Sequence, residues 1–131
     1  MLAVKNNDKH VMKFLCTMFK DIIDINTQNN VGHTALMLAV EKWNFNHIQF
    51  IFDTFRDKID INKQDMNGYT TLMFALRKNN INAVIYLFKT FSDKIDCTKQ
   101  NDEGHTALII AVQKSNFDAI KFICEVIQKK Y

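Results

Sequence analysis

The side chains able to do chemistry are few, and their spacing matches no catalytic or metal-binding motif. The chain has four His and three Cys, with no C-x-x-C, H-x-x-x-H or H-E-x-x-H spacing. It has no G-x-S-x-G motif, and its three Gly do not gather into a phosphate-binding loop. We therefore expect no metal site, no cofactor, no small-molecule substrate and no enzymatic activity.

Length and composition indicate one folded domain. The 131 residues are 47% hydrophobic and 24% charged, which fits a chain with its own core and excludes a disordered one. The net charge of +3 is too small to indicate nucleic-acid binding. No apolar run reaches the ~18 residues of a membrane-spanning helix, and the N-terminus lacks the unbroken apolar stretch of a signal peptide.

A 36-residue repeat runs through the whole chain. The segment Gly-His-Thr-Ala-Leu at 32–36 recurs unchanged at 104–108 and as Gly-Tyr-Thr-Thr-Leu at 68–72. Residues 29–64 and 65–100 are identical at 17 of 36 positions. Such a period is typical of solenoids, in which neighbouring units bury one another's apolar faces. The predicted boundaries are a partial unit 1–28 followed by units 29–64, 65–100 and 101–131.

Each unit predicts two short helices and a turn. Thr34 is a good N-cap for a helix over 35–42, whose apolar residues have helical spacing. Asn44 can cap a second helix. The apolar–polar alternation of 59–62, with turn residues before Gly68, predicts a short β-hairpin.

The cysteines follow the same register. Cys16 and Cys124 fall on apolar positions of second helices, and Cys97 replaces Ile61 of the unit before it. We predict three buried, unreactive thiols without a disulfide. An odd number of Cys with no framework spacing favours a reducing compartment, so we expect an intracellular, cytoplasmic protein.

The unit G-x-T-A-L-x-x-A, followed by a second helix and I-D-I-N, resembles the ankyrin repeat, whose hallmark is T-P-L-H-x-A. The resemblance covers essentially the whole chain, 1–131. It implies an all-α repeat solenoid, an ankyrin-like stack of helix-turn-helix units with short β-hairpin fingers. Departures from the family are the longer unit, the loss of the hallmark Pro at Ala35, Thr71 and Ala107, and the loss of its His at Met37, Met73 and Ile109.

The resemblance also implies a concave face, made of fingers and first helices, that binds a protein partner. Val31 and Lys5 occupy positions that vary on this face. The candidate partner-binding residues are Asn30, His33, Lys42, Met66, Asn67, Tyr69, Arg77, Lys78, Asp102, Glu103, His105 and Lys114.

Two features of this face suggest the nature of the partner. Lys42, Lys78 and Lys114 are equivalent, so stacking places them in a basic row that favours an acidic partner. Met66 and Tyr69 are the thioether and aromatic types that anchor protein contacts. The single Trp, Trp43, we interpret as local packing.

The leading hypothesis is a non-catalytic protein–protein interaction module. One alternative is a structural spacer within a longer array, because Ile109, Ile110 and Phe117 keep the last unit apolar where a capping unit is polar. A third hypothesis, an RNA-binding helical repeat, is less favoured because few aromatic residues recur at exposed positions.

Overall fold

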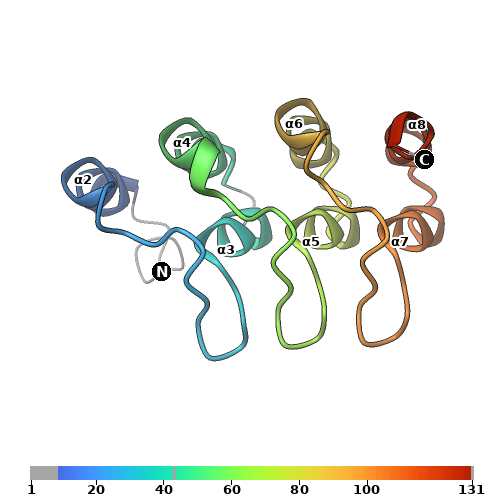
Figure 1. Cartoon of the computed structure of the whole chain (residues 1–131), viewed down its shortest axis with the longest axis horizontal. Coiled ribbons are helices and arrows are strands. Elements are labelled where there is room, and N and C mark those ends of the chain that lie inside the picture. The colour runs from blue at the N-terminus through green and yellow to red at the C-terminus, as the bar shows by residue number, and fades with distance from the viewer. Residues whose placement is uncertain (1–8, 43, 131) are drawn as a thin grey trace.

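The computed structural model describes residues 9–42 and 44–130, which form two rows of helices (Figure 1). The upper, outer row in Figure 1 consists of α2 (Lys9–Phe19), α4 (Phe45–Phe55), α6 (Ile81–Phe91) and α8 (Phe117–Lys130). The inner row consists of α3 (Ala35–Glu41), α5 (Thr71–Arg77) and α7 (Ala107–Gln113). The expected stack of helix-turn-helix units is confirmed. Lys5 and Trp43 lie outside the described residues.

Side-chain caps begin each inner helix where the sequence predicts. Thr34, Thr70 and Thr106 each accept a hydrogen bond from the backbone N–H three residues on, at 3.2, 3.3 and 3.4 Å. In α3 the sulfur of Met37 accepts the Thr34 N–H at 3.4 Å, so a thioether takes part in the cap at the hallmark His position. Asn44 starts α4 in the same way, accepting the His47 N–H at 3.0 Å.

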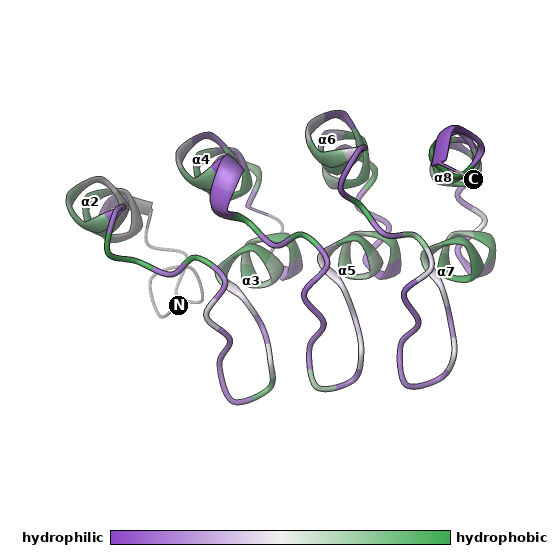
Figure 2. Cartoon of the chain, viewed as in Figure 1, coloured by the Kyte–Doolittle hydropathy of each residue, from purple (hydrophilic) through white to green (hydrophobic). Residues whose placement is uncertain are grey.

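The core lies between the two rows, where apolar faces meet (Figure 2). Phe52, Phe55 and Phe91 are among its largest fully buried side chains. The ring of Phe52 stacks on Tyr86 of the next unit, with centroids 4.9 Å apart. Each unit thus buries aromatic surface against its neighbour, which is the source of stability in a stack.

Asparagine side chains also join successive units. Asn26 donates to the Lys58 carbonyl at 2.8 Å and accepts the Asp60 N–H at 2.7 Å. One unit later, Asn62 makes the same bonds to residues 94 and 96, at 2.8 and 2.9 Å. The two junctions between successive units thus have the same bonds at nearly the same lengths, so each unit is placed on the next in a regular way.

The predicted β-hairpin fingers are not strands, and none of the residues in 9–42 and 44–130 is assigned to a strand. A 3-10 turn, Arg56–Lys58, follows α4, and a further turn follows over 61–62. Ile59 and Ile61 are both buried, with a polar residue between them, because this linker packs on the core. The alternation at 59–62 therefore reflects a buried linker, and the strand prediction was wrong.

The cysteine prediction was correct for one thiol and wrong for another. Cys97 is buried and free, and burial raises its pKa. Cys124 is free but exposed on α8, whereas the equivalent Phe52 and Phe88 are buried against rings of the next unit. The side chain of Cys16 lies outside the described part. Among the helices that the structure describes, none is long and apolar enough to span a bilayer.

Candidate protein-interaction face

Three loops, the fingers, project below the inner helices over residues 24–34, 60–70 and 96–106 (Figure 1). One side chain organises each loop from within. In the second finger, Asp65 Oδ1 accepts the N–H groups of Asn67 and Tyr69 at 2.9 and 2.8 Å. Asn29 and Asn101 do the same in the first and third fingers. These bonds satisfy backbone groups locally, so the loops are ordered before any partner binds.

Neighbouring fingers are also in contact with one another. The Met66 N–H donates to the Val31 carbonyl at 3.1 Å, and the Asp102 N–H donates to the Asn67 carbonyl at 2.9 Å. Gly32 has a φ of +84°, and a Cβ there would lie 2.7 Å from the Met66 nitrogen. Glycine is therefore required both by the backbone conformation and by the close approach of the next finger.

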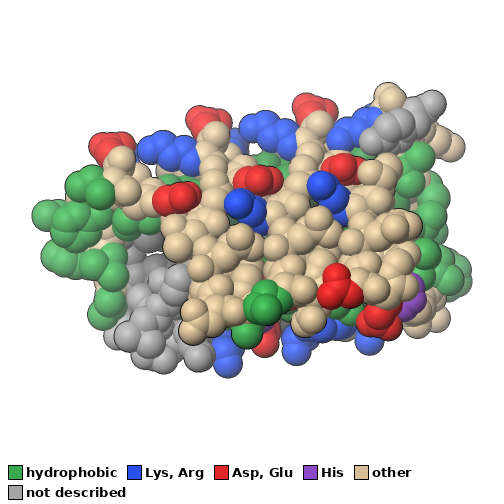
Figure 3. Space-filling view, turned by 60° about the horizontal axis from the view of Figure 1, so that its bottom comes forward, with side chains coloured by type: hydrophobic (Ala, Val, Ile, Leu, Met, Phe, Trp, Pro, Cys, Tyr) green, Lys and Arg blue, Asp and Glu red, His purple; other side chains and the backbone are tan. Residues whose placement is uncertain are grey.

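Two exposed apolar residues at the tips of adjacent fingers are joined by the backbone bond from the Met66 N–H to the Val31 carbonyl. We call Val31 and Met66 the fingertip pair; they are 49% and 68% exposed. In the middle of this loop-bearing face, Figure 3 shows a small hydrophobic area surrounded by other side chains and backbone, whereas larger hydrophobic areas lie at the two ends of the stack. Exposed apolar groups on a rigid loop offer area for a protein contact at low ordering cost.

Sequence analysis missed part of this pair. It placed Val31 at a varying position of the concave face, but named only Met66 as an anchor and left Val31 out of the candidate contact residues. The available signal was that Val31 is apolar where the equivalent Asn67 and Glu103 are polar. Val31 is brought next to Met66 by the backbone hydrogen bond between the first and second fingers.

The predicted contact residues His33 and Tyr69 are only partly exposed, because each has partners within the stack. His33 Nε2 lies 3.4 Å from Asp65 Oδ2, and its ring meets Phe74 edge-on at 5.1 Å. The Arg77 guanidinium lies 4.7 Å from the centre of the Tyr69 ring, a cation–π distance. These side chains hold the fingers on the inner helices, and their part in binding stays a prediction.

The three equivalent lysines are the C-caps of the inner helices. Lys42, Lys78 and Lys114, the lysine row, follow α3, α5 and α7 and are exposed. Within the described residues none of their ammonium groups lies within 4 Å of a carboxylate oxygen, whereas Lys58 Nζ lies 3.9 Å from Asp21. Figure 3 shows Lys and Arg side chains spaced along the length of the stack. The row thus offers uncompensated positive charge to a ligand.

The remaining candidates lie on the finger loops. Asn30 and Asn67 are exposed on the first and second fingers. Asp102 and Glu103 are exposed on the third finger, and His105 is partly exposed there. The structure therefore places an apolar pair and an acidic tip on the fingers, and the lysine row at the C-terminal ends of the inner helices.

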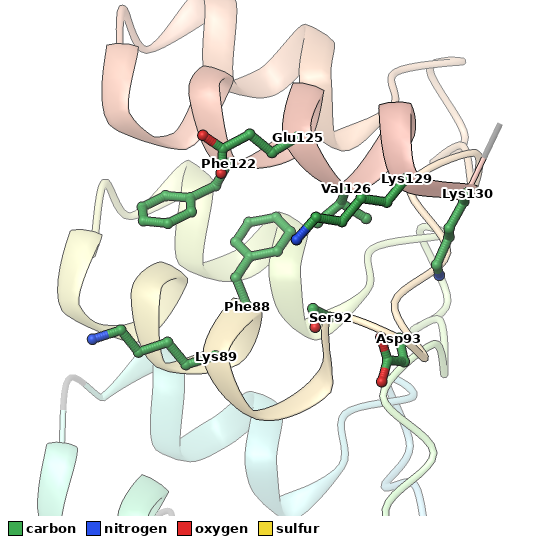
Figure 4. A pocket seen from close by; sticks show the side chains of 9 residues that line it. All are labelled: Phe88, Lys89, Ser92, Asp93, Phe122, Glu125, Val126, Lys129 and Lys130. Atoms are coloured by element: carbon green, nitrogen blue, oxygen red, sulfur yellow. The ribbon is translucent and has the colours of Figure 1, made fainter.

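A hollow of about 250 Å³ lies on the outer row, between α6 and α8 (Figure 4). The Phe88 and Phe122 rings lie beside each other on one wall, with centroids 5.9 Å apart. In the equivalent seam one unit earlier, Tyr86 and Arg56 occupy the positions of Phe122 and Ser92. Because Phe122 and Ser92 are smaller than Tyr86 and Arg56, they leave a hollow at the junction between the last two units. Three lysines and two carboxylates line it, so its charges favour no single ligand class.

The other titratable groups form no reactive site. No group of three His, Cys, Asp or Glu side chains suited to a metal occurs among the described residues. Burial, followed by the nearby Asp53 carboxylate, raises the pKa of Tyr86. Hydrogen bonds from Thr98 hold the pKa of Asp96 below its usual range. Both shifts have structural causes.

Comparison with known proteins agrees with this geometry. A family model described as ankyrin repeats (3 copies) matches residues 1–65 and 54–130. No curated protein matches the chain at a significant level. Ankyrin repeats are generally protein–protein interaction modules and are generally non-catalytic. Because the family model spans almost every residue of this stack of helix pairs, the chain belongs to the ankyrin-repeat family.

Proposed function

We propose that this chain binds a protein partner on the fingers and the lysine row. The observation that carries the proposal is the fingertip pair, two exposed apolar side chains on loops already held in place by hydrogen bonds. A partner can cover Val31 and Met66 without ordering the loops first. The adjacent lysines supply a positive field that favours an acidic partner and speeds its association.

A capture experiment with matched variants tests this proposal. The wild type, the double variant Val31→Ser/Met66→Ser and the control Phe117→Ser are each used as bait in an extract of the source cell. Phe117 is 81% exposed at the start of α8, so its replacement removes a similar apolar group from another surface. We expect a captured protein to be lost with the double variant and kept with the control. Equal capture by all three baits would exclude the fingertip pair as the contact.

Structural support within a longer array is a second candidate, favoured by one observation at the last unit. Ile109 and Val112 are 40% and 57% exposed, whereas the equivalent Met37 and Val40 are buried by the next unit. A further repeat would cover the same surface. If Val112→Glu abolishes capture while the fingertip variant does not, this end face is the functional surface. Captured RNA in place of protein would instead support the RNA-binding hypothesis.

An intracellular location belongs to the same proposal and rests on the thiols. Cys97 and Cys124 are both free. An exposed unpaired thiol such as Cys124 is better suited to a reducing compartment, where it stays reduced.

A further inference from the structure

The spacing of the lysine row restricts the conformation of an acidic partner. Lys42, Lys78 and Lys114 each end an inner helix at the same position of the repeat. Inner helices that pack side by side have axes about 8–10 Å apart. Since the bonds between units have matching lengths at both junctions, each unit is placed on the next in nearly the same way, and the backbone positions of the row recur at a nearly constant step.

Three regular conformations can be compared with this step. In polyproline II, every third residue points the same way and successive ones lie about 9.3 Å apart. In a β-strand, residues on the same face lie about 6.6 Å apart, or about 13 Å apart if every second one is used. Neither distance matches the step of about 8–10 Å between neighbouring inner helices. In an α-helix, every seventh residue lies on one face at about 10.5 Å, but the helix is about 10–12 Å wide. A helix of that width needs more room beside the projecting fingers than an extended segment does, so we favour the polyproline II conformation over the helix.

The geometry points to an extended acidic segment in polyproline II conformation, with a carboxylate at every third residue, bound along the lysine row. This inference rests on the proposed function, because it names the partner of the same face. The three carboxylates would meet Lys42, Lys78 and Lys114 in turn. The segment would lie parallel to the row of fingers, with its other residues free to reach the fingertip pair.

The charges around the row agree with this placement. Glu41 precedes Lys42, but its Oε2 is turned toward His33 Nδ1 at 3.9 Å. Arg77 precedes Lys78 and lies over the Tyr69 ring, so its positive charge stays beside the row. The acidic tip of the third finger repels carboxylates from the finger side, which favours their placement on the lysine side.

Two synthetic proline-rich peptides of equal composition, a helical peptide and an oligonucleotide test the spacing. The first is three Glu-Pro-Pro triplets, which place Glu at every third position. The second has three consecutive Glu flanked by Pro on both sides. The third is an Ala-rich helical peptide with Glu at every seventh position, and a short single-stranded oligonucleotide serves as a general polyanion. Binding to the whole chain is measured by fluorescence anisotropy at low salt, where exposed charge pairs are least screened.

Two triple variants of the protein serve as a matched pair. Lys42→Gln/Lys78→Gln/Lys114→Gln neutralises the row. The control Lys20→Gln/Lys89→Gln/Lys121→Gln removes the same total charge from exposed lysines elsewhere. Any effect of net charge alone is therefore equal in the two variants.

We expect the triplet peptide to bind about tenfold more tightly than the clustered peptide, since it can form three exposed ion pairs at once. Neutralising the row should remove this preference, and the control should keep it. Equal binding of the two proline-rich peptides would overturn the inference, as would tighter binding of the helical peptide or the oligonucleotide. If no peptide binds but capture still depends on the fingertip pair, the inference fails and the proposed function stands. If capture is also independent of the fingertip pair, both fail.

Discussion

Replacing Gly68 and Gly104 by Ala compares a finger that has a neighbour with one that has none. Gly68 has a φ of +82°, and a Cβ there would lie 2.7 Å from the Asn101 Cα and 3.0 Å from the Asp102 nitrogen. Gly104 has nearly the same φ, +79°, but nothing lies within 4 Å of its added Cβ. Both substitutions therefore share the backbone strain, and only Gly68→Ala adds a collision with the next finger.

The shared strain of an L-residue at positive φ is about 1–2 kcal/mol. The nearest atoms at Gly68 belong to backbone, so relief requires the fingers to separate, at a further cost of about 1–3 kcal/mol. Gly104→Ala should lower the free energy of unfolding by the first amount, and Gly68→Ala by the sum. Urea denaturation measures both losses. The slope of the unfolding free energy against urea concentration should be the same in the two variants.

Hydrogen exchange of one amide locates the effect. The Asp102 N–H, which donates to the Asn67 carbonyl, should lose protection in Gly68→Ala and keep it in Gly104→Ala. Equal losses of stability in the two variants, with no change at Asp102, would refute the close packing of the fingers.

Three further outcomes follow from individual contacts. Asn62→Ala should cost about 1–3 kcal/mol in urea denaturation because it removes two cross-unit hydrogen bonds, each contributing about 0.5–1.5 kcal/mol, whereas Thr98→Ala, which removes one side-chain bond within its own unit, should cost clearly less. Cys124 should react with a thiol reagent before Cys97, as mass spectrometry of the labelled peptides would show, and faster labelling of Cys97 would contradict its burial. The pKa of Asp96 is lowered on folding, so its stabilisation is present above the unfolded pKa of about 3.9 and is lost as the pH falls through the lower folded value. Asp96→Asn should therefore flatten the acid limb of stability against pH; an unchanged limb would contradict the Thr98 contact.

The helices could be predicted from the sequence because the repeat and the caps agree. Thr34 and Asn44 begin the helices that they were expected to begin. The error at 59–62 has a physical cause: a linker packed on the core buries Ile59 and Ile61 with the same alternation as a strand. Burial of Cys124 was predicted from its repeat position, but burial at that position depends on the unit that follows.

The candidate face could be predicted only where it follows the repeat. The lysine row is a set of equivalent positions, so a 36-residue alignment identifies it. The fingertip pair joins Val31 to Met66, which are not equivalent positions, through a bond between fingers. The contact of Arg77 with Tyr69 likewise depends on how the finger meets α5. Such contacts require the three-dimensional structure.

Site-specific photo-cross-linking tests the proposed binding face most directly. A photoreactive residue is introduced at position 66, within the fingertip pair, or at position 117, at the start of α8 in the last unit. After irradiation in an extract of the source cell, we expect a protein partner to be cross-linked from position 66 and not from position 117. Cross-linking from position 117 alone would contradict the account and assign binding to the end of the stack.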